Sequence, residues 1–308
     1  FNNYPKFLFK FCRRKFIMIK KLNYKEVDFS LYSKCLDQSL QKNRYAKKEV
    51  LDLLSESWEL LVYGDYEFVM PIPIKKKIGF RIVIMPLFCQ QLGIFGPEHN
   101  EEIEILFLEF LQKNYRVYSY AFNFHNLVTQ NLSKKKNYFI EETEYQLLRK
   151  NYFKGRKSTV KTAQYLIFKE LKSTDFLDFI KSNFKGLDKK GDVNQFFRYM
   201  NFLESENKLR LFGSYKENEL TNMAIIIDDE NRFSLLGLIN EDQYKSDNGA
   251  SFLIDRILKE NIHEKSFDFM GGSIRGIEVF FKSFGAILQE YTILVNSKKD
   301  LLKKIYKK

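Results

Sequence analysis

A carboxylate, a pair of glycines and a lysine follow one another in the segment FDFMGGSIRGIEVFFKSFGA, residues 267–286. Asp268 precedes Gly271-Gly272, so its carboxylate could accept a proton from an attacking amine or hydrogen-bond the N–H groups of the turn. Lys282 follows at helical spacing, where an ammonium could stabilise an oxyanion or a phosphate. The alternative for Lys282 is a solvated helix face on which it pairs with Glu278.

The same segment predicts a short buried strand, a tight turn and a helix. The turn lets the backbone approach a ligand closely, and the helix, which we expect Ser273 to cap, offers unpaired N–H donors. The helical spacing predicts one buried apolar face, made of Ile274, Ile277, Phe281 and Phe284. The opposite face is polar and carries Arg275, Glu278 and Lys282.

Residues 281–285, Phe-Lys-Ser-Phe-Gly, resemble the Phe-Lys-x-x-Phe-Gly segment of Fem-like acyltransferases, with one residue instead of two between Lys282 and Phe284. The whole of 267–286 resembles the C-terminal signature of that GNAT-related family, in which an acidic-aromatic strand and a Gly-Ser turn come first. The resemblance implies an enzyme that transfers an acyl group to an amine by direct attack in a ternary complex. It implies that Lys282 is a catalytic residue near the acyl donor, and Asp268 is the second candidate catalytic residue.

The resemblance extends over nearly everything from Met18 onward. Residues 58–73 and 86–96 look like segments of uncharacterised Fem-like GNAT proteins from Bacteroidetes-type bacteria. The resemblance implies an α/β (α+β) fold of two tandem GNAT-like domains, each with a mixed, mostly antiparallel sheet flanked by helices. We expect these domains at 18–135 and 136–308. Residues 1–17 lack the patterning of the rest, so we expect a dispensable extension there.

Periodicity and turn residues predict the elements of both halves. Gly64-Asp65 is the expected turn of a hairpin, and Pro71 and Pro73 are expected to end its regular pairing. Further strands are predicted at 81–85, 117–121, 137–141, 209–215, 221–227, 234–239, 267–269 and 287–295. Helices are predicted at 30–41, 47–54, 102–112, 149–161, 174–183, 194–206, 251–260 and 299–307.

Two further groups of residues are candidate binding sites. Asn248, Gly249, Ala250 and Ser251 open the helix that follows a strand, which is where the GNAT fold binds the pyrophosphate of coenzyme A. The first three of them are similar to part of the family's phosphate pattern, and the alternative is a plainly capped helix. Gln90 and Gln91 follow a strand and a proline, where two amides could orient a polar substrate or satisfy the loop backbone.

Two arginines complete the candidate substrate contacts. Arg156 lies on the predicted basic helix 149–161, whose position resembles the cation-bearing helix at the domain junction of Fem-like proteins. Arg275 lies on the polar face of the signature helix. For both, the alternative is a solvated helix face.

The bulk composition limits the partners. The 51 Lys and Arg against 39 Asp and Glu give a formal net charge of +12, which attracts polyanions in general. We expect a small-molecule acyl donor as co-substrate, first acyl-coenzyme A and second aminoacyl-tRNA, with an amine acceptor and no tightly bound cofactor. The competing interpretation is a non-catalytic GNAT-like binding module, or a tRNA-dependent Fem-type transferase acting on a cell-wall precursor.

The remaining features point to a cytoplasmic protein without a metal. Cys12, Cys35 and Cys89 are too widely spaced for a disulfide framework or a metal cluster, and the three histidines are equally scattered. A reducing compartment fits this pattern best. No run approaches the roughly 18 apolar residues that a membrane span needs.

Overall fold

The structure is a computed structural model that describes residues 18–77, 79–127, 132–172, 176–187, 189–297 and 299–301. The expected extension at 1–17 and the end of the predicted terminal helix beyond 301 lie outside these residues. Within the part of the chain described, no helix is both long and apolar enough to span a membrane.

The first half is built on a four-stranded antiparallel sheet of order β1-β2-β3-β4. Its strands are β1 (Lys20–Asn23), β2 (Ser57–Tyr63), β3 (Phe68–Lys77) and β4 (Phe80–Val83). Its helices are α1 (Phe29–Gln38), α2 (Lys48–Leu54) and α3 (Glu101–Asn114), with short 3-10 turns at Tyr24–Glu26 and Arg44–Ala46. Trp58 and other buried aromatic and aliphatic side chains fill the core between the sheet and these helices.

The second half is built on an eight-stranded sheet of order β5-β12-β6-β11-β10-β9-β8-β7, whose outermost strand, β5, is contributed by the first half of the chain. Its strands are β5 (Ser119–Ala121), β6 (Ser133–Ile140), β7 (Ile167–Leu171), β8 (Leu209–Lys216), β9 (Glu219–Asp229), β10 (Arg232–Asn240), β11 (Ser266–Asp268) and β12 (Ile287–Val295). Its helices are α4 (Tyr145–Asn151), α5 (Lys154–Thr162), α6 (Leu177–Asn183), α7 (Lys190–Ser205), α8 (Gly249–Asn261) and α9 (Arg275–Lys282), with a 3-10 segment at Asp242–Asp247.

The two halves repeat one order of elements, which confirms the predicted tandem GNAT-like fold. The order β1-α1-α2-β2-β3-β4-α3-β5 in the first half recurs as β7-α6-α7-β8-β9-β10-α8-β11 in the second. In both, a helix follows the fourth strand and leads into a segment parallel to it. That parallel pairing is a bridge between Val83 and Val117 in the first half and the β10–β11 ladder in the second.

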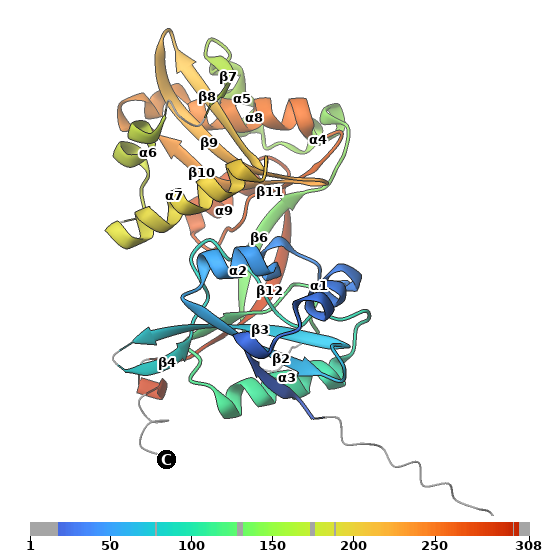
Figure 1. Ribbon diagram of the computed structural model, residues 1–308. Helices are drawn as coiled ribbons and strands as arrows, with labels where there is room; N and C mark the ends of the chain where they lie inside the picture. The colour runs from blue at the N-terminus through green and yellow to red at the C-terminus, as the bar shows by residue number, and fades with distance from the viewer. Residues whose placement is uncertain are drawn as a thin grey trace, which may run out of the picture.

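Strands β6 and β12 join the halves. β6 pairs with β11 of the second half, and β12 pairs with β6 along its length and with β5 at its end. Figure 1 shows these two strands running between the lower lobe, which holds β1–β4, and the upper lobe, which holds β7–β10. The expected domain boundary between residues 135 and 136 falls inside β6, and a division at that point stays a prediction.

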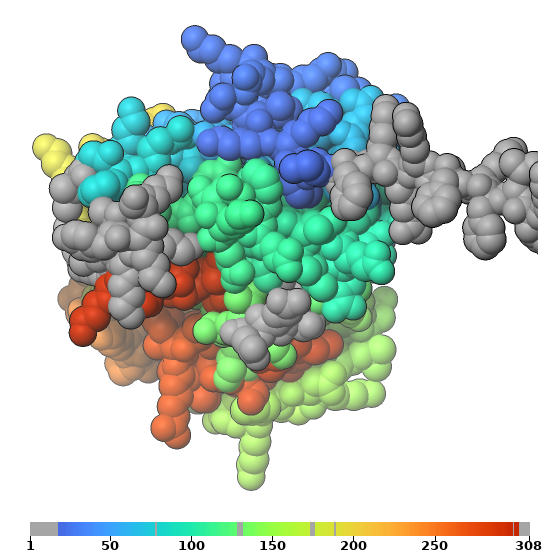
Figure 2. All heavy atoms as spheres, turned by 90° about the horizontal axis from the view of Figure 1, so that it is seen from below, coloured from blue at the N-terminus to red at the C-terminus, as the bar shows by residue number. Residues whose placement is uncertain are grey.

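The lobes are close-packed against the C-terminal segment. Seen from below, green atoms of the first half lie directly beside red atoms near the end of the described chain (Figure 2). The second half has its own aromatic core between the sheet and helices α8 and α9, which buries Phe267, Phe269, Phe281 and Phe284. This core fixes the backbone around the signature segment.

The expectation that Pro71 and Pro73 end regular pairing is wrong, because β3 continues to Lys77. Pro71 pairs with Leu60, and Pro73 pairs with Trp58, both on β2. The carbonyl of Pro73 accepts a hydrogen bond from Ile84 N–H, on the side of β3 away from β2. The missing proline N–H therefore points away from the β2 ladder, where its loss removes no pairing bond.

The signature helix also differs from the expectation. α9 begins at Arg275 after the apolar Ile274, so Ser273 is not its cap. Phe281 and Phe284 are buried as predicted, whereas Ile274 is 66% exposed and Ile277 is 41% exposed. The reason is that both isoleucines line a cavity instead of the core. The predicted basic helix 149–161 is likewise two helices, α4 and α5.

Candidate functional site

A slot opens where two parallel strands separate. β10 and β11 pair over three residues, from Arg232 with Ser266 to Ser234 with Asp268, and β10 then continues with a register shift between Leu235 and Gly237. The cavity between them has a volume of about 650 Å³. It is lined mainly by the end of β10, the 269–273 turn and α9, with Leu235, Leu238, Met270, Gly272, Ile277 and Phe280 among its walls.

Gly272 is needed in the wall of this slot. Its φ of +139° is one that other residues rarely adopt, and a Cβ there would lie 2.4 Å from the ring of Tyr138. The turn is also tied to β6, because the N–H of Tyr138 donates to the carbonyl of Gly271. The glycine pair in the sequence therefore shapes the slot through close packing against β6.

The N-terminus of α8 lies at the same slot. Asn248 has a left-handed φ of 58° before the helix, and Ala250 lines the cavity. A Cβ on Gly249 would lie 1.7 Å from Oδ1 of Asn222, so this glycine lets α8 pack on β9. The first turn, 249–252, is uncharged. The N–H groups of Ser251 and Phe252 donate to the carbonyl of Asn248, which leaves those of Gly249 and Ala250 as the donors that this helix start can offer to an anion.

The equivalent helix of the first half is different. Asn100 caps α3 by accepting from the N–H of Ile103, and the first turn carries Glu101, Glu102 and Glu104. These carboxylates complement the helix dipole and repel an anion. Of the two equivalent helix starts, the one in the second half is therefore suited to a phosphate-bearing donor.

Ser251 and Arg156, two predicted binding residues, contact each other. Arg156 donates to the hydroxyl of Ser251 and, at 2.8 Å, to that of Ser283. Its guanidinium also stacks over the rings of Phe280 and Phe284, at 4.4 and 4.6 Å from their centroids. Burial lowers the pKa of Arg156 to about 10. Arg156 thus ties α5, α8 and α9 together behind the slot.

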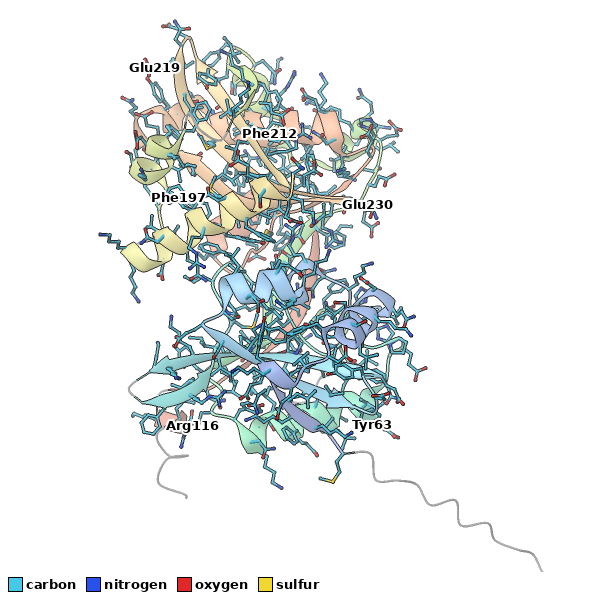
Figure 3. The ribbon with its side chains drawn as sticks, in the orientation of Figure 1. Tyr63, Arg116, Phe197, Phe212, Glu219 and Glu230 are labelled. Carbon is cyan, nitrogen blue, oxygen red and sulfur yellow. The ribbon has the colours of Figure 1, made fainter. Side chains whose placement is uncertain are left out.

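A second cavity, the cleft, lies between the two halves and has a volume of about 500 Å³. It brings together three predicted site residues: Gln90 and Gln91 from the first half and Asp268 from the second. The other lining residues include Lys42, Arg44, Tyr45, Lys47, His125, Lys208, Asp229, Glu230, Arg232 and Gln289. Figure 3 shows Glu230 at the end of the β9–β10 hairpin nearer the first half, with Glu219 at the far end.

A chain of side-chain amides connects the glutamines to the acid. Gln91 donates to Oε1 of Gln90 at 3.3 Å, and Gln90 donates to Oδ1 of Asn137 at 3.0 Å. Asn137, which is fully buried, then donates to Oδ1 of Asp268 at 3.0 Å. The N–H of Phe124 completes the chain by donating to Oε1 of Gln91. Neither glutamine is free to turn, so their positions are fixed before a substrate arrives.

Asp268 has the properties of a proton acceptor. Its side chain is 7% exposed, and burial raises its pKa above the usual range against the opposing effects of Arg232, Met270 N–H and Asn137. Oδ1 accepts from Asn137 and from the N–H of Met270 at 2.7 Å, while Oδ2 lies 3.5 Å from Arg232. A carboxylate with a raised pKa is a stronger base for an amine than an ordinary surface aspartate.

A third cavity, the chamber, links the slot with the cleft and has a volume of about 330 Å³. It shares Lys135, Leu235, Leu236, Met270 and Tyr291 with the slot and Gln90 with the cleft. Tyr291, on β12, is 6% exposed, and burial raises its pKa to about 12. Its hydroxyl therefore stays protonated at neutral pH and can donate a hydrogen bond or a proton.

Lys282 and Arg275, by contrast, lie on the exposed side of α9 and belong to the lining of neither the slot nor the cleft. Glu278 pairs with Lys136 of β6 at 2.9 Å and accepts from the hydroxyl of Tyr138 at 2.7 Å. The expected Glu278–Lys282 pair is therefore replaced by a contact that ties α9 to the sheet. A catalytic role for Lys282 stays a prediction.

The described cysteines are placed for packing. Cys35 and Cys89 are buried, and burial raises the pKa of both thiols, that of Cys35 to about 11. Both are therefore thiols at neutral pH and poor nucleophiles. Among the residues described, no cluster of His, Cys, Asp and Glu side chains is placed to hold a metal ion.

Sequence reasoning missed Asn137, Arg232 and Tyr291. Each lies in an ordinary strand pattern, and only the pairing of β6, β10, β11 and β12 brings them to one place. One signal was available: Asn137 and Gln289 are polar residues within strands, and their register places them opposite each other on β6 and β12. Uncharged polar residues facing each other inside a sheet indicate a built polar site.

Comparisons with known proteins bear on the fold. No protein-family model matches this sequence, and no curated protein matches it. Among solved structures, FemX is similar over 93% of this chain and 99% of its own, with a TM-score of 0.63 and 10% identity. A conserved protein of unknown function from Bacteroides thetaiotaomicron is similar over 91% and 100%, with a TM-score of 0.55 and 8% identity.

A tandem GNAT protein from the clavulanic acid biosynthesis pathway is similar over 89% of this chain and 97% of its own, with a TM-score of 0.52 and 7% identity. At such identities the likeness concerns the path of the backbone. The resemblance stated from the signature segment is confirmed at that level: the chain has the fold of Fem-like and tandem GNAT proteins.

Proposed function

We propose that this protein is an N-acyltransferase that holds an activated acyl donor in the slot and an amine acceptor in the cleft. The observation that carries this proposal is the position of Asp268. It is the last residue of β11 before the strands diverge and lines the cleft, while the two residues that follow it, Phe269 and Met270, line the slot. A donor and an acceptor entering from opposite sides would meet at this residue.

The proposed reaction is direct attack of the amine on the acyl carbon of a thioester. Asp268 takes the proton of the ammonium, the C–N bond forms and the C–S bond breaks. The hydroxyl of Tyr291 gives its proton to the departing thiolate and is reprotonated by the second proton that the nitrogen loses as the amide forms, and Asp268 releases its proton to solvent. The amides of Gln90 and Asn137 hold Asp268 and the cleft wall in place. This route needs no covalent enzyme intermediate.

Acyl-coenzyme A is the proposed donor. The uncharged first turn of α8 offers the backbone N–H groups of Gly249 and Ala250 to the pyrophosphate, and Ala250 lines the slot. Lys185 also lines the slot, and its ammonium pairs with Asp242 at 2.6 Å. The apolar walls contributed by Leu238, Ile277 and Phe280 suit the uncharged pantetheine arm.

Aminoacyl-tRNA is the second candidate donor, and the charge of the cleft favours it. The cleft lining carries Lys42, Arg44, Lys47, Lys208 and Arg232 against Asp229, Glu230 and Asp268. Such an excess attracts a phosphate backbone. An acceptor that is a cell-wall precursor follows only from the likeness to FemX. A cytoplasmic location is proposed because the described thiols are unpaired.

Calorimetric titration with coenzyme A and acetyl-coenzyme A tests the donor, and thiol release in the presence of a panel of primary amines tests the transfer. The proposal expects binding with a negative heat-capacity change and amine-dependent release of thiol. Binding of aminoacyl-tRNA without binding of coenzyme A or acetyl-coenzyme A would make aminoacyl-tRNA the proposed donor. Binding without turnover on any amine would favour the non-catalytic module.

A further inference from the structure

We propose that one surface of the second half docks on an anionic phospholipid membrane. This surface, the basic face, is formed by α4 and α5 together with the end of α9 and the start of β12, residues 145–162 and 279–287. It is separate from the proposed transferase site, because its exposed apolar side chains, Phe153, Val279 and Ile287, line neither the slot nor the cleft.

The two segments of the basic face are in direct contact. The N–H of Phe153 donates to the carbonyl of Ser283 at 3.0 Å, which places the start of α5 against the end of α9. Val279 lies one helical turn before Ser283, on the same side of α9. Gly285 packs closely on the end of α4, since a Cβ there would lie 2.9 Å from that of Asn151. The side chains of the two segments therefore share one region of the surface.

The charge of the basic face is positive. Residues 145–169 include no Asp or Glu, and neither do residues 279–289. In the described part of the chain, no carboxylate lies within ion-pair distance of four lysines on α4 and α5: Lys150, Lys154, Lys157 and Lys161. These charges are therefore available to an anionic partner.

The acids that border these segments lie to the side. The carboxylate of Glu278, which precedes Val279, is held against β6 by Lys136 at 2.9 Å and by the hydroxyl of Tyr138 at 2.7 Å. Glu144 precedes α4, at the end of that helix away from α5. The lysines of α5 thus have no acid beside them in the sequence to offset their charge.

Bulky apolar side chains stand among these lysines. Phe153, Val279 and Ile287 are each at least half exposed. Exposed apolar groups beside uncompensated lysines are typical of surfaces that bind membranes. The lysines are attracted to the anionic headgroups, and the apolar side chains enter the boundary of the acyl chains. The combination of charge and exposed apolar area favours a lipid surface as the partner.

A nucleic acid is the other common polyanion, and it suits this face less well. Its phosphates would contact the lysines, and a base could stack on Phe153. The branched aliphatic side chains of Val279 and Ile287 offer no π face on which a base can stack. A lipid surface would remove all three apolar side chains from water, which is favourable in proportion to the area buried.

Co-sedimentation of the full chain with vesicles tests the proposal. We expect binding to vesicles of phosphatidylcholine with an equal part of phosphatidylglycerol, weakening as salt is added, and no binding to phosphatidylcholine alone. Phe153→Ser should weaken binding by about tenfold, because a large apolar group is lost. It should spare the fold, since serine is a preferred residue at this N-cap position of α5 and the bond to Ser283 uses the backbone. Leu106→Ser removes an exposed leucine from α3 and should bind as the parent.

Lys150→Glu combined with Lys154→Glu tests the charge. Each lysine close to an anionic surface contributes roughly fivefold to affinity, so reversing two should abolish sedimentation. Lys75→Glu combined with Lys76→Glu makes the same change in net charge on exposed residues of β3 and should bind as the parent. Equal loss in both double variants would show that net charge alone attracts the vesicles and would overturn the basic face.

Phe153→Trp reports on the depth of contact. The native Trp58 is buried and is the chain's single tryptophan, so quenching by brominated phospholipid would come from the introduced indole and support the proposal. A vesicle-bound variant without quenching would overturn it, and so would equal binding to neutral and anionic vesicles. Binding of a transfer-RNA mixture that is lost in the Lys150→Glu, Lys154→Glu variant, without binding to anionic vesicles, would overturn the lipid surface in favour of a nucleic acid.

Discussion

The side-chain amide of Asn137 donates a 3.0 Å hydrogen bond to Oδ1 of Asp268, and this bond crosses from β6 to β11. β6 follows the first half in the chain, and β11 belongs to the second, so the carboxylate is positioned by a strand that joins both halves. Asn137 also accepts from Gln90. The position of the proposed base therefore depends on the packing of the two halves, and a separated second half would lose it.

Asp268→Asn should lower turnover by about two to four orders of magnitude, the range seen when a positioned general base is removed. An asparagine can keep its Oδ1 as acceptor for Asn137 and for the N–H of Met270, so the surrounding structure should survive. Turnover of the parent should rise with pH through the raised pKa of Asp268, because the base works only when ionised. The variant should lack this rise.

The same substitution should stabilise the protein at neutral pH. Burial raises the pKa of Asp268, so the folded protein favours the protonated carboxyl. The contribution of this carboxyl to stability is complete below the ordinary aspartate pKa of about 3.9, and it is lost as the pH rises through the pKa in the folded protein. The melting temperature of Asp268→Asn should therefore exceed that of the parent at pH 7 and approach it near pH 4. Thermal melts at both pH values measure this difference.

Asp255→Asn is the matched control for Asp268→Asn. Asp255 is also a buried aspartate whose pKa burial raises, but it bonds Tyr145 behind the sheet and is not part of the cleft lining. Its substitution should change stability and spare turnover. Equal loss of activity in both variants would show that the effect comes from the fold and would remove Asp268 from its proposed role.

Tyr291→Phe should lower turnover by about a hundredfold while leaving the affinity for the donor within about twofold. The hydroxyl is the proposed proton donor to the thiolate, a role expressed in the transition state, whereas the ring that packs in the chamber wall is retained. Single-turnover rates and donor titration separate the two quantities. An unchanged rate with weakened donor binding would make Tyr291 a wall residue only.

The signature segment predicted the fold because its order of strand, turn and helix is local, and a catalytic role for Asp268 stays a prediction. The repeat of elements in the two halves could also be inferred, since each hairpin and helix has its own periodicity. The pairing of β6 with β11 and of β12 with β5 could not, because it joins residues more than a hundred positions apart. The series of side-chain hydrogen bonds from Gln91 through Gln90 and Asn137 to Asp268 depends on that pairing, so it could not be predicted from the sequence either.

Errors in the signature helix have a related cause. Helical spacing places Ile274 and Ile277 in line with Phe281, but it does not tell a core from a cavity wall. Because β10 and β11 diverge, the first turn of α9 faces the slot and not the packed core. Ile274 and Ile277 therefore stay exposed. Apolar residues that a fold leaves exposed beside a cavity are candidates for ligand contact.

Ala250→Glu should weaken binding of coenzyme A and stabilise α8 at the same time. A carboxylate in the first turn interacts favourably with the helix dipole, by about 0.3–1 kcal/mol, but repels the pyrophosphate proposed to bind there. It would give α8 the acidic first turn that α3 already has. Ala250→Gln is the control, since it adds nearly the same volume without charge.

Titration and thermal melts of both variants test this expectation. Loss of affinity in the glutamate variant alone, with an equal or higher melting temperature, would place a donor phosphate at the start of α8. Equal loss in both variants would mean that the position is crowded, and the charge of the helix start would then have no role in binding.

Lys282→Ala tests the last candidate from the signature segment. The side chain is exposed at the end of α9, and Phe281 and Phe284 hold the helix on the other side. The substitution should therefore change the free energy of unfolding by no more than about 0.5 kcal/mol. If the ammonium stabilises charge on the donor or in the transition state, as a lysine near the acyl donor could, turnover should fall by roughly a hundredfold. We expect this fall.

Arg275→Ala is the charge-matched control for Lys282→Ala, because Arg275 is also exposed on α9 and lies near the opposite end of the helix. It removes the same formal charge from the same surface, so a general electrostatic effect on donor attraction would appear in both variants and would weaken with added salt. A specific role predicts that Lys282→Ala alone loses turnover and that added salt does not abolish the difference. Parent-like turnover in Lys282→Ala would return this lysine to the solvated face of the helix and leave Asp268 and Tyr291 as the proposed catalytic pair.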